Sequence, residues 1–323
     1  MFWRERVLAN KSHRTHDRNA FLEKFSSWGK GLSGDALQRL SWHDARNHSE
    51  KIWVGRNNFS LPFSSSLISE DLFSMTFNKV IEIDHLSYDY PDGTPALRDI
   101  RLEVYQHESI AILGPNGAGK STLLYHLNGT LMGDGKVIIL GIPIKKESLM
   151  EIRRRVGLVF QSPEDQLFCP TVFDDVAFGP LNMGLDEEKV RHRVEKALEV
   201  MGLNGFEGRS AHHLSEGEKK RVALATVLSM DSEILALDEP TDNLDPAGSR
   251  MLVERIQSIP QTKVIVTHHL PVAVDLCERA VLLYGGRKVE DLPMRELVKN
   301  RALLEQFGFD ADFAQWMYSR KKG

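Results

Sequence analysis

The sequence predicts an α/β fold in which a parallel sheet is buried on both faces and an antiparallel β edge lies beside it. Three observations predict this fold. Continuous apolar runs at residues 109–113 and 234–237 are typical of strands buried between helices. Near-alternate apolar residues over 81–90, closed by the turn residues Pro91-Asp92-Gly93, indicate strands with one buried face. The 323 residues can bury a substantial core, and 41% hydrophobic with 27% charged residues is typical of a soluble globular protein.

Composition excludes several classes of protein. No apolar run approaches the roughly 18 residues that a membrane span needs, and the first thirty residues lack the apolar block of a secretory signal. The two cysteines, Cys169 and Cys277, lie far apart, which argues against a disulfide scaffold or a zinc ribbon. We expect two buried thiols in a reducing compartment, the cytoplasm by default. A net charge of −4 argues against a nucleic-acid partner.

The first 74 residues differ from the rest of the chain. They carry a net charge of +3, against −7 for the rest, and they hold four of the five tryptophans. They show no sustained period of a helix or a strand. We therefore predict that residues 1–74 are an N-terminal extension, either weakly structured or a non-native upstream start, and that residues 75–323 form one domain. A real N-terminal module that binds a partner is the alternative.

The apolar run 109–113 leads directly into a glycine-rich loop of the form G-x-x-x-x-G-K-S. Leu123, Leu124 and Leu127 share one face of the helix that we expect after it. Glycines let such a loop wrap so closely that its N–H groups point at phosphate oxygens, while Lys120 adds a charge and the Ser121 hydroxyl a magnesium ligand. The motif predicts that a nucleoside triphosphate binds to Gly114, Pro115, Asn116, Gly117, Ala118, Gly119, Lys120, Ser121 and Thr122.

The apolar strand 234–237 delivers two adjacent carboxylates at its end. In this context Asp238 is expected to hold the magnesium shell, and Glu239 to accept a proton from the attacking water. Adjacent acids at a strand end are otherwise often part of a solvated loop. Together with the glycine-rich loop upstream, the pair predicts a P-loop NTPase core of the RecA-like type.

One further segment indicates which class of P-loop ATPase this is. It reads Leu214-Ser215-Glu216-Gly217-Glu218 and is followed by Lys219-Lys220-Arg221 and an apolar helix. Here the sequence resembles the ATP-binding-cassette (ABC) ATPases, over about residues 78–290. The family's aromatic, P-loop, glutamine, signature, Walker B strand and histidine occur in the required order. The resemblance implies a core with a helical insert subdomain at about 162–213.

The resemblance also implies roles for single residues. Tyr90 matches the aromatic that stacks on adenine, with Tyr88 as the fallback. Gln161 matches the glutamine that senses magnesium and the γ-phosphate, so the expected Mg²⁺ ligands are Ser121, Gln161 and Asp238. His268 matches the switch histidine that contacts the γ-phosphate, and His269 is expected to be a bystander, although register alone leaves the swap open.

Two such domains face each other in this family, and each ATP lies between the P-loop of one and the signature of the other. The resemblance therefore implies a second ATP-binding subunit, in a homodimer or a heterodimer. It assigns the contact across the interface to Ser215, Glu216, Gly217 and Glu218 and the dimer loop to Asp245. Closure on ATP would drive the conformational change, because ATP binds the two states differently.

A narrower resemblance lies between residues 160 and 182. Two runs of residues look like the energy-coupling-factor and cobalt/nickel importer ATPases. They are Phe160-Gln161-Ser162-Pro163-Glu164-Asp165-Gln166-Leu167-Phe168 and Asp175-Val176-Ala177-Phe178-Gly179-Pro180-Leu181-Asn182. This implies that a transmembrane coupling subunit docks near residues 162–182. We expect Phe168, Val172, Val176 and Phe178 to be core residues, and exposed acids such as Asp174 and Asp175 to touch the partner.

Two positions depart from the family's pattern. The usual Leu-Ser-Gly-Gly is Leu-Ser-Glu-Gly here, and Glu218 stands where a glutamine is usual. A Glu216 carboxylate facing the partner's γ-phosphate would cost roughly 1 kcal/mol or more through repulsion, whereas one pointing outward would cost little. Ser215 and Gly217 are intact, so we expect a working site with slower turnover.

The chain ends in a segment, at about 291–323, that is helix-like with a break near Gly308. Its apolar side chains should pack on the core or on a second copy; they are Leu297, Leu303, Leu304, Phe307, Phe313 and Met317.

We therefore expect an ATP-hydrolysing subunit of an ABC-type importer, peripheral on the cytoplasmic face of the cell membrane, with ATP and Mg²⁺ as cofactors. It would energise uptake of a small solute, of the cobalt/nickel ion or vitamin type, through separate membrane subunits. One alternative is a soluble cassette ATPase of DNA repair or translation, although the chain has neither a long coiled-coil insertion nor tandem cassettes. The other alternative is a catalytically weak regulatory subunit, because Glu216 departs from the family's signature.

Overall fold

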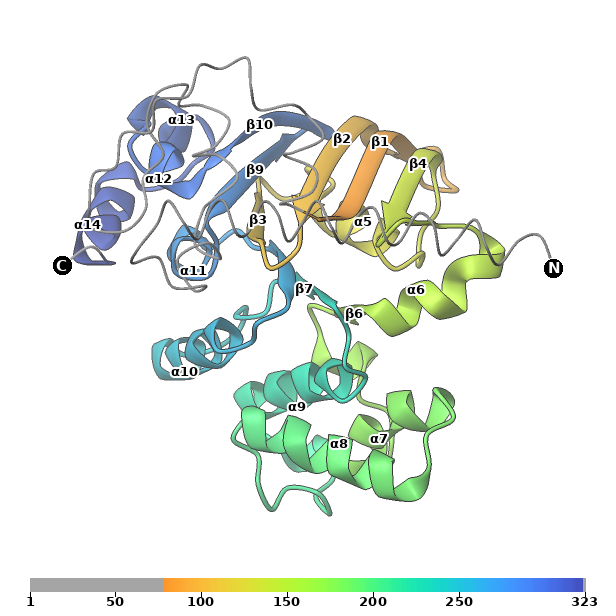
Figure 1. Cartoon of the computed structure of the whole chain (residues 1–323). Coiled ribbons are helices and arrows are strands. Elements are labelled where there is room, and N and C mark those ends of the chain that lie inside the picture. The colour runs from red at the N-terminus through yellow and green to blue at the C-terminus, as the bar shows by residue number, and fades with distance from the viewer. Residues whose placement is uncertain (1–77, 322–323) are drawn as a thin grey trace, which may run out of the picture. The chain divides into compact units, whose positions relative to one another are not determined.

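The computed structural model describes residues 78–321, and the extension predicted for residues 1–74 lies outside this range. Residues 74–323 form one compact unit. Its described part consists of two sheets and the helices that pack on them (Figure 1). No helix within residues 78–321 is both long and apolar enough to cross a membrane.

A small antiparallel sheet comes first in the chain. Its strand order is β2-β1-β4-β5, with bounds Lys79–Asp89 (β1), Pro95–Tyr105 (β2), Asp134–Ile139 (β4) and Ile142–Pro143 (β5). The predicted turn folds β2 back on β1, and its Gly93 adopts a φ of 83°, which favours glycine. This sheet is the antiparallel edge that the sequence predicts.

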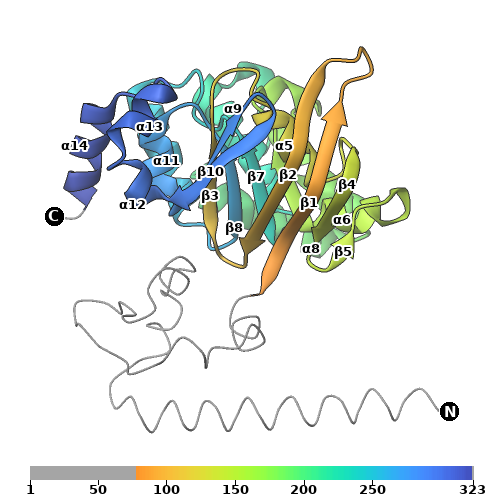
Figure 2. The ribbon, with the colours of Figure 1, turned by 90° about the horizontal axis from the view of Figure 1, so that it is seen from above.

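The larger sheet has the strand order β10-β9-β3-β8-β7-β6. Neighbours are parallel throughout, except that β10 is antiparallel to β9. Its strands are Ser109–Leu113 (β3), Val156–Val159 (β6), Ile234–Asp238 (β7), Thr262–Val266 (β8), Arg279–Tyr284 (β9) and Arg287–Pro293 (β10). Every residue of β6, β7 and β8 is buried, as the apolar runs predict. Because parallel strands end at one edge, the loops after β3, β7 and β8 lie together there (Figure 2).

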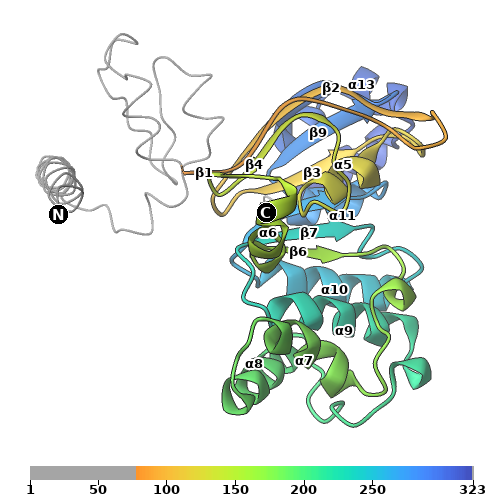
Figure 3. The ribbon, with the colours of Figure 1, turned by 90° about the vertical axis from the view of Figure 1, so that its right-hand side faces the viewer.

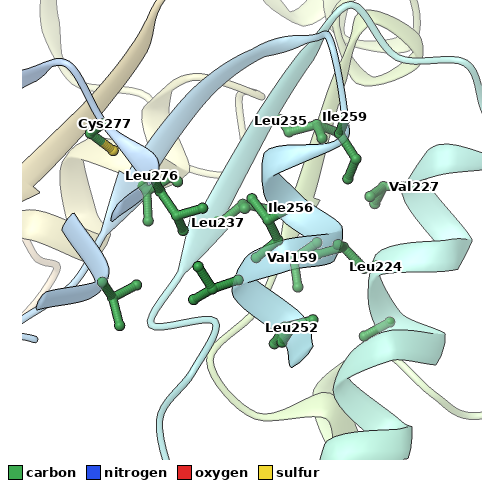
Figure 4. Packing of buried hydrophobic residues seen from close by; sticks show 14 of the residues in the cluster. Val159, Leu224, Val227, Leu235, Leu237, Leu252, Ile256, Ile259, Leu276 and Cys277 are labelled. Atoms are coloured by element: carbon green, nitrogen blue, oxygen red, sulfur yellow. The ribbon is translucent and has the colours of Figure 1, made fainter. Parts of the chain in front are cut away.

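Helices cover both faces of the larger sheet. α5 (Lys120–His126) packs against β7, β8 and β2, and so lies between the two sheets, with Leu123, Leu124 and Leu127 buried. On the other face lie α10 (Pro246–Gln257) and α11 (Leu270–Leu276). Figure 4 shows Leu252 and Ile256 of α10 between the sheet and the helix α9 (Glu216–Leu228). Each fully buried Leu or Ile here contributes roughly 1.5–3 kcal/mol to folding.

The chain between β6 and β7 forms a helical lobe, which lies below the sheets in Figure 1. α6 (Leu149–Arg155) leads to β6, and the lobe itself consists of α7 (Val172–Asn182), α8 (Glu187–Val200) and α9 (Glu216–Leu228), which pack on one another. Single-turn 3-10 helices lie at Lys146–Ser148, Pro163–Asp165 and Ala211–His213. The lobe therefore continues through the helix that follows the signature, beyond the predicted limit of about 213.

The C-terminal tail is helical, with the expected break. It forms α12 (Met294–Leu297), α13 (Arg301–Gln306) and α14 (Ala311–Lys321), and Gly308 between the last two has a φ of 75°. α14 packs on α11 of the same chain, although Phe313 is about half exposed. Of the two thiols predicted to be buried, Cys277 is buried but Cys169 is not fully so.

A buried ion-pair cluster joins the ends of the two sheets. The Arg279 guanidinium donates to Asp291 Oδ1 (2.6 Å), to Glu108 Oε1 (3.0 Å) and to the carbonyl of Glu103 (3.0 Å). Burial alone would raise the pKa of Asp291, but the Arg279 hydrogen bond and charge hold it below its usual value. Since removing one partner of a buried pair strands the other charge, Arg279 is a structural residue.

Candidate functional site

The glycine-rich loop follows β3, and its conformation requires glycine at two positions. A Cβ at Gly114 (φ 151°) would lie 2.2 Å from the carbonyl oxygen of Leu283, and one at Gly119 (φ 95°) 2.5 Å from that of Ala96. The Lys120 Nζ donates to the carbonyls of Gly114 and Pro115, both at 3.0 Å. Burial lowers the pKa of Lys120, and the charges of the two carboxylates at the end of β7 oppose this.

The end of β7 places Asp238 against α5. Ser121 Oγ donates to Asp238 Oδ1 (3.0 Å), and the hydroxyl of Tyr125 donates to Oδ2 (2.9 Å). Burial raises the pKa of Asp238, and these two hydrogen bonds oppose the rise. Mg²⁺ prefers oxygen ligands, and the Ser121 hydroxyl and the Asp238 carboxylate offer two of them side by side, so these residues fit the ion.

Glu239 is buried, and its carboxylate lies against His268. The backbone N–H of His268 donates to Oε2 (3.2 Å), and the ring Nδ1 lies 2.9 Å from Oε1. The backbone at Glu239 has a φ of 43°, and its carbonyl accepts from Lys220 Nζ (3.1 Å), which also donates to the carbonyl of Gln161. Lys220 thus connects the signature helix to two predicted site residues.

One cleft of about 290 Å³ lies at the strand ends; Lys120, Ser121, Glu239 and His268 line it, whereas the buried Asp238 does not. Gln161 enters it from the loop after β6, where its amide nitrogen donates to Asp242 Oδ2 (2.9 Å). This hydrogen bond is the main reason that the pKa of Asp242 lies below its usual value. The cleft is lined by Asn116, Gly117, Gly119, Lys120, Ser121, Thr122, Gln161, Glu239, Asp242 and His268.

Sequence reasoning missed three residues of this region. Asp242 follows Glu239 by three positions, and Tyr125 lies one helical turn after Ser121, so spacing could have indicated both. Lys220 is buried, with its pKa lowered by burial, but the sequence pattern gave it no role beyond a family resemblance. Conversely, Gly114, Pro115 and Ala118 support the loop without lining the cleft.

Tyr90 lies at the end of β1, beside α5. Its hydroxyl is 2.8 Å from Thr122 Oγ1, and its ring meets that of Tyr88 edge-on at 5.2 Å. Tyr88 also packs on the ring of His126, at 5.0 Å. Tyr90 is the more exposed of the two tyrosines, and its stacking on adenine stays a prediction.

The signature lies at the start of α9, and none of its residues lines the cleft of this chain. Ser215 caps the helix: its N–H and its hydroxyl donate to Glu218 Oε2, at 2.8 and 2.7 Å. Glu216 is half-buried in the first turn, and Asp245 caps α10 by accepting from the N–H of Gly248 (2.7 Å). The contact of the signature with the nucleotide of a second subunit stays a prediction.

The segment 162–182 corrects two predictions. Asp175 was expected at the surface, but it is only 3% exposed, and its Oδ1 accepts the N–H groups of Phe168 (3.0 Å) and Cys169 (2.9 Å). Phe168 and Phe178 were expected in the core, but they are 65% and 49% exposed and meet edge-on at 5.0 Å. Asp174 is exposed and Val172 and Val176 are buried, as predicted.

Comparison with known proteins decides the family. A model described as ABC transporter matches residues 97–242. A putative ABC transporter ATP-binding protein of Geobacter sulfurreducens is 50% identical over 226 residues, which are 70% of this chain and 91% of that protein. The chain belongs to the ABC transporter ATP-binding proteins. The energy-coupling factor transporter ATP-binding protein EcfA of Methanothermobacter thermautotrophicus is 46% identical, over 70% of this chain and 75% of the relative.

Solved structures agree with this assignment. The structure of cbiO1 from Clostridium perfringens, described as part of the ABC transporter complex cbiONQ, has a TM-score of 0.64 and 35% identity, and it covers 71% of this chain and 94% of that one. A dimeric ATP-binding cassette in a post-hydrolysis state, bound to ADP and Pi, has a TM-score of 0.60 and 27% identity over 67% of this chain. The predicted P-loop core of ABC type is confirmed, and the protein is an ATPase, the ATP-binding subunit of a transporter.

Proposed function

We propose that this ABC ATPase drives an importer of the energy-coupling-factor type, taking up a small solute such as a cobalt or nickel ion or a vitamin. The observation that carries the proposal is the exposed pair Phe168 and Phe178 on the helical lobe. Large aromatic side chains left in solvent mark interaction surfaces, because their burial on a partner is favourable. The similarity to the energy-coupling factor ATP-binding protein supports the same kind of partner.

The cleft supplies the groups that hydrolysis needs. N–H groups of the glycine-rich loop and Lys120 would hold the phosphates, and Glu239 would accept the proton of the attacking water. The backbone N–H of His268 holds the Glu239 carboxylate by a hydrogen bond, and its ring packs against the other carboxylate oxygen, so the base is oriented before substrate arrives. Bound Mg²⁺, held by Ser121, Asp238 and Gln161, would neutralise developing charge on the phosphates.

Turnover would require two subunits. The signature residues Ser215 and Gly217 lie outside the cleft of their own chain, which supports their contact with the nucleotide of a second ATP-binding subunit. Asp245 would reach across the same interface. The lobe would pass the closing motion to the membrane subunit through residues 162–182, at the cytoplasmic face of the membrane.

The proposal is tested by isolating the protein from its own cells. The tagged full chain is purified from membranes in mild detergent, and its companions are identified by mass spectrometry. We expect integral membrane proteins to co-purify and the complex to hydrolyse ATP. Recovery of an active ATPase without any membrane companion would favour the soluble alternative, and a complex without turnover would favour the regulatory one.

A further inference from the structure

Three potential metal ligands lie together at the edge of the nucleotide cleft. Asp242, His268 and His269 each offer one ligand atom, and these atoms lie within 4.8 Å of one another. The two imidazole rings are adjacent, with centroids 4.0 Å apart, and both are exposed. A small shift of side chains would bring all three donors onto one ion.

The contacts around this group favour a metal-binding arrangement. His268 Nδ1 lies 2.9 Å from Glu239 Oε1, and a neutral ring protonated at Nδ1 would present Nε2 as a ligand. Metal-binding histidines commonly donate their other nitrogen to a carboxylate in this way, because the bond fixes the ring and its tautomer. Asp242 is held in turn by the Gln161 amide.

We propose that Asp242, His268 and His269 bind a divalent transition-metal ion, and that this ion inhibits the ATPase. Two imidazoles and a carboxylate suit Zn²⁺, Co²⁺ or Ni²⁺, and three protein ligands leave a position for water. The predicted Mg²⁺ ligands Ser121 and Asp238 offer oxygen atoms, which Mg²⁺ prefers, whereas two of the three ligands in this group are imidazoles, which suit transition metals.

The inhibition follows from where two of the ligands lie. Asp242 and His268 line the cleft, whereas His269 does not. An ion held by all three would engage the imidazole that is proposed to contact the γ-phosphate. This second step rests on the proposed function, but binding of the ion does not.

The test of binding uses the full chain without a histidine tag and without nucleotide. Co²⁺ is titrated and followed by its visible absorption, and Zn²⁺ by calorimetry in the presence of excess Mg²⁺. We expect one ion per chain and at least about tenfold weaker binding for His269→Ala, since even second-shell changes cost about 10–100-fold. His192→Ala, which removes another exposed histidine, on α8, is the matched control. Equal binding by the two variants, or no binding by the parent, would overturn the site.

The test of inhibition measures ATP hydrolysis with Mg²⁺ in excess and Ni²⁺ added. We expect Ni²⁺ to inhibit the parent and the His192→Ala variant, and about tenfold more Ni²⁺ to be needed for His269→Ala. Without Ni²⁺ the three proteins should hydrolyse ATP alike. Binding without inhibition would overturn the regulatory role, and absence of any ATPase activity in the parent would count against the proposed function and leave the binding result intact.

Discussion

The nucleotide cleft and the segment 162–182 both bury a carboxylate, but for different purposes. In the cleft, Asp238 accepts a hydrogen bond from Ser121 and Glu239 lies against the His268 ring, and the chemistry itself would use both of these side chains. In the helical lobe, Asp175 is held by two backbone N–H groups and closes the turn before α7. The cleft thus presents its acids for reaction, whereas the lobe uses its acid for structure and presents aromatic rings.

The difference shows which groups a partner can reach. A buried acid whose hydrogen bonds go to backbone amides is committed to the fold, because each unpaired amide would cost stability. An exposed ring has no such commitment. Mutations in the cleft should therefore change turnover without loss of folding, whereas mutations in the lobe should divide into those that change partner binding and those that change stability.

The largest expected effect is in the cleft. Glu239→Gln should keep ATP binding but lower turnover by about 10²–10⁴-fold, because the amide cannot accept the proton of the attacking water. ATP hydrolysis and nucleotide binding are measured in parallel, with size-exclusion chromatography to detect a trapped ATP-bound dimer. Glu254→Gln, at an exposed position of α10, is the control. Hydrolysis at the parental rate would show that Glu239 is not the base.

The next effect is on partner binding. Replacing Phe168 and Phe178 together by Ser should weaken recovery of the membrane partner by about tenfold or more, since aromatic anchors can each contribute about 2 kcal/mol to an interface. The isolated variant should hydrolyse ATP and unfold like the parent, because both rings are exposed. Unchanged recovery would place the docking surface elsewhere, and lower thermal stability would mean that the pair is structural.

A third prediction separates the two acids of the same segment. Asp175→Ala should destabilise the protein by about 1–3 kcal/mol, since it leaves the N–H groups of Phe168 and Cys169 unpaired. Asp174→Ala, at the exposed neighbouring position, should cost below about 1 kcal/mol. Urea denaturation measures both variants. Equal losses would mean that burial of Asp175 does not decide its contribution.

How well the sequence predicts each region depends on whether a local motif or packing between distant segments determines it. The loop after β3 was predictable because Gly114 and Gly119 meet a backbone requirement that only glycine satisfies, and the catalytic pair because a buried strand ends at it. Asp242 and Tyr125 lie at spacings that could have indicated them, but their hydrogen-bond partners, Gln161 and Asp238, lie in distant segments that no local motif connects.

In the lobe, apolar character alone predicted burial for Phe168 and Phe178, and this was wrong. A sequence pattern does not distinguish an apolar residue kept for the core from one kept for a partner. Likewise, the charge of Asp175 suggested exposure, whereas two backbone amides in the turn before α7 stabilise its buried carboxylate.

The smallest expected effect concerns the signature. It lies at the start of α9 in the helical lobe of its own chain, and in the proposed dimer it would face the partner's cleft. Glu216 is half-buried in the first turn of α9, close enough to Lys219 and Lys220 for its charge to interact with theirs, so the lysines already offset part of any repulsion. Two charges about 4 Å apart in water interact by about 1 kcal/mol, so Glu216→Gly should lower the KM for ATP by less than about fivefold. The gain should shrink as salt is added, because salt screens exposed charges. Glu216→Gln removes the charge while keeping a good helix former, and should behave alike if charge is the cause. No change in either variant at any ionic strength would mean that the carboxylate points away from the partner's nucleotide.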